Sequence, residues 1–153
     1  MSIEHKHSTP TFNQIQTMIG GVILLSQYSP LHQRYVLAEW QQRIMPSFEL
    51  NQYCYYEDEN QRPVAFCNWA FVSEENRRLL LNGERELIDS DWRSGSHIFM
   101  PEMIAPFGHA REVVNDLRSR VFAPWQGQKV CTVRAKVSAK NNRCIRKVQW
   151  FSI

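Results

Sequence analysis

The sequence predicts an α+β domain with a central, antiparallel-rich mixed sheet flanked by helices. Apolar residues recur at helical spacing near the N-terminus and again over residues 109–122, which predicts amphipathic helices in both places. Aromatic and β-branched runs typical of strands occur over residues 49–72 and 129–153. The elements follow the order helix, helix, hairpin, helix, strand, helix, strand, strand, which is typical of an α+β layout.

Length and composition place the chain among single-domain globular proteins. Its 153 residues are enough to bury a core, and 43% hydrophobic with 22% charged residues is the usual balance of a folded domain. A net charge of +3 is too small to indicate nucleic acid as a partner, and we expect none. We find no internal repeat and no linker, so we predict a disordered tail over residues 1–10 and a single domain over residues 11–153.

The first helix is predicted to follow Thr11. Its apolar residues stand at positions 12, 15, 18, 19, 22 and 23, which is the spacing of one helix face. Gly20 and Gly21 lie in the middle of this helix. They either weaken the helix or allow another element to pack closely against it.

The second helix is predicted over residues 30–45. Ser29 suits the N-cap, Pro30 suits the first helical position, and Pro46 is expected to end the helix. His32 would then lie in the first turn, at the positive end of the helix dipole, where a neutral imidazole is favoured over an imidazolium. Such a histidine is either there by chance or is a base kept in its neutral form.

The remaining segments alternate between strand and helix patterns. Residues 49–58 and 62–72 predict an antiparallel hairpin, and residues 129–137 and 144–153 predict two closing strands. Between these pairs we expect a short helix or two, a strand interrupted by prolines, and an amphipathic helix, in residues 74–88, 96–108 and 109–122.

The four cysteines are expected to be reduced thiols. Their spacing forms neither a C-x-x-C motif nor a Cys/His zinc pattern, so the sequence predicts no metal site. The N-terminus has no signal-peptide pattern, and the longest apolar run, residues 18–25, is too short to span a bilayer. We therefore expect a cytoplasmic protein without a transmembrane segment.

Two residues are candidates for chemistry, His32 and Glu102. The sequence contains no Walker, G-x-G-x-x-G or G-x-S-x-G motif. Glu102 lies in an apolar segment, where a buried carboxylate needs a partner. His32 could be that partner, because a carboxylate stabilises the imidazolium that forms when histidine abstracts a proton. The alternative is that Glu102 faces solvent on an edge strand and that His32 lies on the surface.

The segment from residue 133 to residue 147 is rich in Lys and Arg and contains no acidic residue. It either meets an acidic partner or a phosphate group, or it forms a solvated pair of strands whose charges serve only solubility. Its basic residues are Arg134, Lys136, Lys140, Arg143, Arg146 and Lys147.

Five short motifs occur in one order along the chain: SPLH at 29–32, NQY at 51–53, PVAFCNWA at 63–70, DWRSG at 91–95 and IAPFG at 104–108. Together they resemble the motifs of the RTX toxin-activating lysine acyltransferases. Members of this family are cytoplasmic bacterial proteins that move a fatty acyl group from acyl carrier protein to internal lysines of a pore-forming protoxin. The resemblance also implies a fold similar to that of the GNAT acyltransferases.

The resemblance implies roles for four residues. The family histidine corresponds to His32 as the general base, and the serine of the same motif corresponds to Ser29 as a substrate-binding residue. The catalytic aspartate of the family corresponds to Glu102, whose side chain is longer by one methylene. A basic residue that binds substrate corresponds to Arg134.

These roles imply acyl carrier protein and an RTX protoxin as partners, no bound cofactor or metal, and leave a homodimer open. We expect the carrier protein rather than coenzyme A as donor, because residues 105–114 hold one glycine and Pro106 removes an N–H that could bind pyrophosphate. An acyl-enzyme through a cysteine or serine is the less favoured route, since the sequence places no residue for it. The alternative function is a catalytically inactive homologue that binds an RTX-type protein as a chaperone, which the change from aspartate to Glu102 supports.

Overall fold

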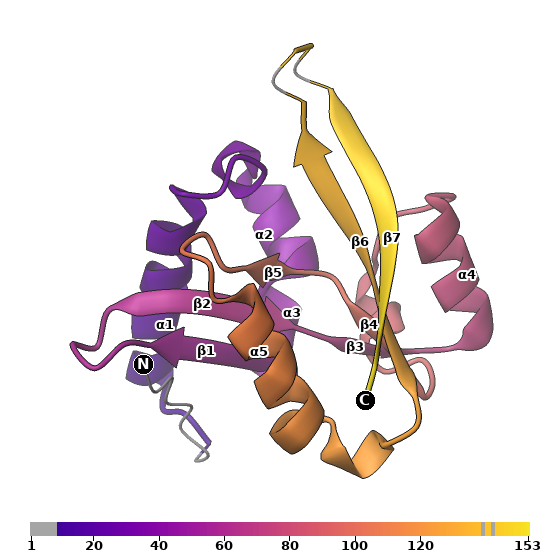
Figure 1. Ribbon diagram of the computed structural model, residues 1–153, viewed down its shortest axis with the longest axis horizontal. Coiled ribbons are helices and arrows are strands. Elements are labelled where there is room, and N and C mark those ends of the chain that lie inside the picture. The colour runs from indigo at the N-terminus through magenta and orange to yellow at the C-terminus, as the bar shows by residue number, and fades with distance from the viewer. Residues whose placement is uncertain (1–8, 139, 142) are drawn as a thin grey trace.

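The computed structural model describes residues 9–138, 140–141 and 143–153 and shows helices packed on two sheets (Figure 1). Residues 1–8 of the predicted tail lie outside the described residues. The helices are α1 (Phe12–Ser26), α2 (Leu37–Arg43), α3 (Met45–Leu50), α4 (Glu74–Asn82) and α5 (Ala110–Asp116). The strands are β1 (Tyr53–Glu57), β2 (Pro63–Asn68), β3 (Ala70–Val72), β4 (His97–Met100), β5 (Met103–Ile104), β6 (Lys129–Val137) and β7 (Cys144–Ser152).

The strands form one sheet in the order β1-β2-β5 and a second in the order β3-β4-β6-β7. The pair β4–β6 is parallel, and the other strand pairs of the described residues are antiparallel. The α+β class and the antiparallel-rich mixed pairing are therefore confirmed. The expected central sheet, however, is divided into two by its hydrogen bonding.

The division falls where two predicted strands are interrupted. The run 62–72 breaks at Trp69, between β2 and β3, and the chain between β4 and β5 breaks at residues 101–102. Hydrogen bonds join the two breaks, because the Asn68 N–H donates to the Glu102 carbonyl at 3.2 Å and the Glu102 N–H donates to Asn68 Oδ1 at 3.0 Å. Glu102 thus lies at the junction of the two sheets and not within a strand, as the sequence had suggested.

The first sheet is covered on both faces. Tyr53 and Tyr55 pack in the cluster that includes α1, and Cys54 and Tyr56 pack in the cluster that includes α5. This alternation along β1 follows from the two-residue period of a strand. Figure 1 shows α1 behind the sheet and α5 in front of it.

Close packing explains one glycine of the pair in α1. A Cβ on Gly21 would lie 2.0 Å from the Tyr55 hydroxyl oxygen, so only glycine fits there. Nothing lies within 4 Å of the corresponding position on Gly20. Of the two alternatives for this pair, close approach is confirmed at Gly21.

A cleft opens where β5 and β6 separate. β4 pairs with β6 at Phe99↔Cys131 and Met100↔Thr132, after which β5 pairs with β2 while β6 continues beside β7. The β6–β7 hairpin extends beyond the body of the domain (Figure 1). The cleft beside the diverging strands has a volume of about 1330 Å³. This arrangement agrees with the expected GNAT-like fold.

The predicted helix over residues 30–45 is wrong. A single 3-10 turn, His32–Arg34, is followed by extended backbone at Tyr35 and Val36, and α2 begins at Leu37. The Val36 N–H donates to the Glu39 carboxylate at 2.8 Å, which satisfies a donor at the start of α2. Pro46 lies in the first turn of α3 and does not end a helix, because a first-turn residue needs no N–H donor.

Other predictions hold with local changes. Residues 74–88 contain the helix α4, which ends at Gly83 with a φ of 70°, and residues 109–122 contain α5 followed by a π-helical turn, Leu117–Val121. All four cysteines are free; Cys144 is exposed and the other three are buried. Within the described residues, no helix has the length and apolar character needed to cross a bilayer.

Candidate active site

The SPLH segment forms a tight turn that brings Ser29 onto His32. The Gln33 N–H donates to the Ser29 carbonyl at 3.0 Å, and the Ser29 hydroxyl lies 2.6 Å from His32 Nδ1. Ser29 is therefore not the N-cap of a long helix, and its hydroxyl pairs with the imidazole instead. Because a single 3-10 turn carries little dipole, His32 does not lie at the positive end of a helix dipole as predicted.

Glu102 contacts the other nitrogen of the same ring. His32 Nε2 lies 2.7 Å from Glu102 Oε2, and the two side chains are only 6% and 2% exposed. The predicted pairing of these residues, 70 positions apart, is present in the structure. An ionised carboxylate only accepts hydrogen bonds, so Nε2 carries the proton, and Nδ1 accepts from the Ser29 hydroxyl.

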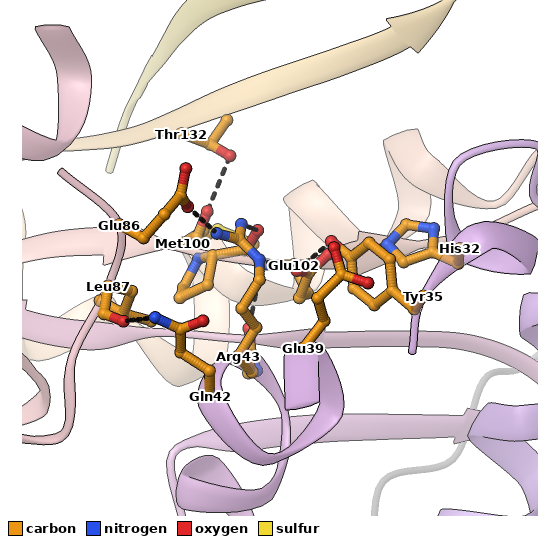
Figure 2. A network of polar contacts seen from close by, with 12 residues as sticks. His32, Tyr35, Glu39, Gln42, Arg43, Glu86, Leu87, Met100, Glu102 and Thr132 are labelled. Atoms are coloured by element: carbon orange, nitrogen blue, oxygen red, sulfur yellow. Dashed lines mark hydrogen bonds and ion pairs between the residues drawn. The ribbon is translucent and has the colours of Figure 1, made fainter. Parts of the chain in front are cut away.

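Two further groups hold the second oxygen of Glu102. The Tyr35 hydroxyl donates to Oε1 at 2.6 Å, and Arg43 Nε donates to Oε1 at 2.5 Å. Arg43 Nη2 also donates to the carbonyl of Pro101, at 2.9 Å. Figure 2 shows Glu102 between His32 and Tyr35 on one side and Arg43 on the other. The carboxylate is therefore fixed in position from both sides.

These partners keep Glu102 ionised. Burial by itself would raise the pKa of Glu102, but the charge of Arg43 and the hydrogen bonds from His32 and Tyr35 outweigh it and hold the pKa below its ordinary value. Burial and the neighbouring carboxylate raise the pKa of Tyr35, so its hydroxyl stays protonated and donates. The site thus contains a buried carboxylate beside an imidazole that can accept a proton at Nδ1.

Asn68 ties this network to the sheet junction. Its side-chain amide donates to the Arg43 carbonyl at 2.8 Å and to Ser47 Oγ at 3.3 Å, while its Oδ1 accepts from the Glu102 N–H. The residue is fully buried. One side chain from the PVAFCNWA motif therefore sets the position of α2 relative to Glu102.

The sequence analysis missed Tyr35, Arg43 and Asn68. Asn68 is a polar residue in an apolar strand, and the argument applied to Glu102 would have found it. Tyr35 and Arg43 gave no such signal, because an aromatic and a cation in a predicted amphipathic helix are ordinary core and surface residues.

Arg134 lies on the opposite wall of the cleft from the dyad. It is exposed on β6, directly opposite Lys147 on β7, and both line the cleft together with Ser29, His32 and Glu102. Within the described residues, no ion pair joins Arg134 or Lys147 to an acidic side chain. Like charges placed opposite each other on neighbouring strands repel, so this wall of the cleft is positively charged.

Comparison with known proteins gives the family. The model of the RTX toxin acyltransferase family matches residues 11–152. The chain belongs to this family. It is 74% identical to the lysine-acyltransferase RtxC of Vibrio cholerae, with both chains covered along their whole length.

More distant relatives share the family but match over shorter spans. The chain is 35% identical to the protein-lysine myristoyltransferase HlyC of Escherichia coli over 96 residues, which is 63% of this chain and 55% of the relative. It is 33% identical to the RTX-I toxin-activating lysine-acyltransferase ApxIC of Actinobacillus pleuropneumoniae over 101 residues, 66% of this chain and 58% of the relative. The resemblance stated from five motifs is thereby confirmed.

Proposed function

We propose that this protein transfers a fatty acyl group from acyl carrier protein to internal lysines of an RTX protoxin and thereby activates the toxin. The names of its relatives support lysine acylation and toxin activation. One observation carries the catalytic part of the proposal, namely the His32–Glu102 contact of 2.7 Å in the wall of the cleft. It pairs a base with the carboxylate that stabilises its protonated form.

The mechanism begins with the acceptor lysine, which is mostly protonated at neutral pH and is no nucleophile until it loses a proton. His32 Nδ1 accepts that proton, and Glu102 stabilises the imidazolium through Nε2. The amine nitrogen then forms a bond to the thioester carbonyl, the carbon–sulfur bond breaks, and the departing thiolate takes up a proton. A positioned base of this kind contributes about 10²–10⁴-fold in rate.

The oxyanion of the tetrahedral intermediate needs donors near the dyad. β5 is the edge strand of its sheet and follows Glu102 directly, and Met103 and Ala105 line the cleft. Because β5 spans only Met103–Ile104, the chain leaves the sheet after Ile104 and its later N–H groups are not taken up by pairing with β2. Backbone N–H groups of residues 103–108 other than Pro106 are therefore the donors we propose for the developing charge.

The β6–β7 hairpin supports a protein donor. Arg134, Lys136, Arg146 and Lys147 line the cleft, and all four are exposed. An acidic carrier protein would complement this basic face, and its binding should weaken as salt rises. Coenzyme A would need a phosphate loop at the turn before α5, where Pro106 supplies no N–H.

The alternative, an inactive homologue, rested on the longer side chain of Glu102. That side chain reaches His32 at 2.7 Å with Arg43 and Tyr35 behind it, so the substitution preserves the contact that catalysis needs. The geometry therefore favours the enzyme over a binding partner without activity.

The test is acylation of a purified RTX protoxin from the same organism, measured by mass spectrometry of its lysines. We expect the wild type to form acyl-lysine with acylated carrier protein as donor, and to do so more slowly at high salt. Acyl-coenzyme A in place of the acylated carrier protein should give little acyl-lysine. His32→Ala should reduce the rate by at least about 10²-fold, as expected for loss of a general base. His97→Ala is the matched control, because His97 lies outside this cleft and pairs with Glu74.

Two results would contradict the proposal. A wild-type protein that binds the protoxin but leaves every lysine unmodified would identify the inactive homologue. If acyl-coenzyme A transfers its acyl group as efficiently as the acylated carrier protein, the proposal that the carrier protein is the donor is wrong.

A further inference from the structure

We propose that Arg43 is a positioning residue that sets the lower end of the pH range in which this protein transfers acyl groups. Arg43 acts through Glu102, whose position and charge it controls. The inference rests on the proposed acyltransferase function and adds to it the group that keeps the base free of a proton.

The guanidinium of Arg43 holds the chain at the break between β4 and β5 (Figure 2). Its Nε donates to Glu102 Oε1 at 2.5 Å, and its Nη2 donates to the Pro101 carbonyl at 2.9 Å. The main-chain carbonyl of Arg43 accepts a hydrogen bond from the Asn68 side-chain amide at 2.8 Å, and Asn68 Oδ1 accepts from the Glu102 N–H. The last residue of α2 therefore fixes the segment that carries Glu102 through both its side chain and its main chain.

The charge of Arg43 balances the charge of the buried pair. The side chains of Glu102, His32 and Arg43 are 2%, 6% and 20% exposed. While His32 is neutral and able to accept a proton, the charges of Arg43 and Glu102 cancel. Without Arg43 the pair would carry an uncompensated negative charge away from water, which is costly. The pair would then take up a proton at a higher pH than it does in the wild type.

That proton would block the base wherever it is bound. On His32 it would occupy the nitrogen that has to accept the proton of the lysine. On Glu102 it would remove the charge that stabilises the imidazolium. Because the two groups titrate as a coupled pair, acyl transfer stops in both cases at a pH where the wild type is still active.

Arg43 itself stays charged throughout. Burial lowers the pKa of Arg43, but the charge of Glu102 and the hydrogen bonds with Glu102 and Tyr35 outweigh it and raise the pKa. Tyr35 cannot replace this charge, since burial and the neighbouring carboxylate raise the pKa of its hydroxyl and keep it neutral. The guanidinium is therefore the permanent positive charge in direct contact with Glu102.

Two further carboxylates and a basic wall face the same cleft. Glu86 lies 3.5 Å from Arg43 Nη1, but its side chain is 64% exposed, and Glu39 accepts the Val36 N–H. The basic residues on the opposite wall are exposed: Arg134, Lys136, Arg146 and Lys147. Salt screens exposed charges far more than buried ones, so only the effect of Arg43 should persist when salt is raised.

The experiment measures kcat/KM for acylation of the protoxin from about pH 5 to about pH 9, at low and at high salt. In Arg43→Gln the acid limb of the profile should move upward by at least about one pH unit, and the shift should remain at high salt. The lysine of the protoxin titrates in the same way with every variant, so differences between profiles report on the enzyme. Glu86→Gln should leave the acid limb unchanged, because its charge is screened by solvent.

A conservative variant separates the charge of Arg43 from its geometry. Arg43→Lys keeps the positive charge but lacks the fork that contacts Glu102 and Pro101 together. Its acid limb should move by less than half of the shift in Arg43→Gln, while its maximal rate falls. If Arg43→Gln does not fold, Arg43→Met supplies a second neutral side chain, and thermal unfolding of each variant identifies the folded ones.

Arg85→Gln is the matched control. Arg85 binds the buried Asp91 through two nitrogens, each at 2.6 Å, but it does not line the cleft. Its loss should lower the unfolding temperature and leave the acid limb where it is in the wild type. An equal shift in Arg85→Gln would show that the profile follows stability, and the role assigned to Arg43 would be wrong.

The failure of this inference differs from the failure of the proposed function. If a folded Arg43→Gln keeps the wild-type profile, or loses the same fraction of its rate at every pH, Arg43 does not set the pH range and acyl transfer stands. If the wild type acylates no lysine at any pH, the proposed function itself fails.

Discussion

Two buried carboxylates of this protein, Glu102 and Asp91, have similar surroundings and different consequences. Asp91 is fully buried and binds both terminal nitrogens of Arg85, each at 2.6 Å, and it accepts the Ile88 N–H at 2.9 Å. Glu102 is almost as deeply buried and also binds an arginine, Arg43. Burial and an arginine partner therefore do not distinguish a structural carboxylate from a catalytic one.

The difference lies in the remaining partner. Within the described residues, the donors to Asp91 are a guanidinium and a backbone N–H, and neither group ionises near neutral pH. Glu102 contacts His32, whose second nitrogen contacts a half-buried hydroxyl in the cleft. A carboxylate becomes part of a reactive site when its partner can gain and lose a proton beside a group that the substrate can reach.

The largest expected effect is a difference in acyl-transfer rate between variants of the two carboxylates. Glu102→Gln removes the charge that stabilises the imidazolium and should lower acyl transfer per folded molecule by at least about 10²-fold. Asp91→Asn leaves the cleft residues in place, so its transfer rate per folded molecule should remain within about twofold of the wild type. Rates normalised to the folded fraction, measured by circular dichroism, make the comparison.

Asp91→Asn should instead reduce stability. The Arg85 side chain that would lose its partner is 27% exposed, so the loss of its charged hydrogen bonds should cost about 1–3 kcal/mol. Urea unfolding would measure this as a lower midpoint at an unchanged slope. If folded Asp91→Asn loses acyl transfer, or if Glu102→Gln keeps full acyl transfer, then Asp91 is not purely structural or Glu102 is not catalytic.

A smaller effect concerns pH. Although burial opposes it, Arg43, His32 and Tyr35 place the pKa of folded Glu102 below its ordinary value of about 4.3. A carboxylate with a lowered folded pKa contributes stability above its unfolded pKa and loses that contribution as pH falls through the folded pKa. The free energy of unfolding should therefore decline more steeply below about pH 4.3 in the wild type than in Glu102→Gln. Parallel declines in urea titrations between pH 3 and pH 7 would contradict this.

The smallest effect sharpens the role of side-chain length. Glu102→Asp retains the charge but is shorter by one methylene, so its carboxylate cannot contact His32, Tyr35 and Arg43 as closely as the glutamate does. We expect a substantial part of the acyl transfer to remain, within about tenfold of the wild type, because the family resemblance implies a catalytic aspartate at this position. A rate as low as that of Glu102→Gln would mean that this site depends on the full reach of the glutamate.

Sequence reasoning succeeded where the signal is local. The apolar spacing of α1, the hairpin β1–β2, the helix α5 and the alternating pair β6–β7 all follow from periods that neighbouring residues define. It failed over residues 30–45, where an N-cap serine, a proline and a helical stripe suggested one helix. There the chain is extended at Tyr35 and Val36, and tertiary contacts with Glu102 override the local preference.

By itself, the sequence determined the α+β class, the family and the need of Glu102 for a partner, because a carboxylate in an apolar segment is costly when unpaired. Only the tertiary structure decided which groups satisfy it. Tyr35 and Arg43 lie 67 and 59 residues away from Glu102 along the chain, and no local pattern records such a contact. The contact of Glu102 with Nε2 of His32 joins residues 70 positions apart, and it leaves Nδ1 to the local partner Ser29.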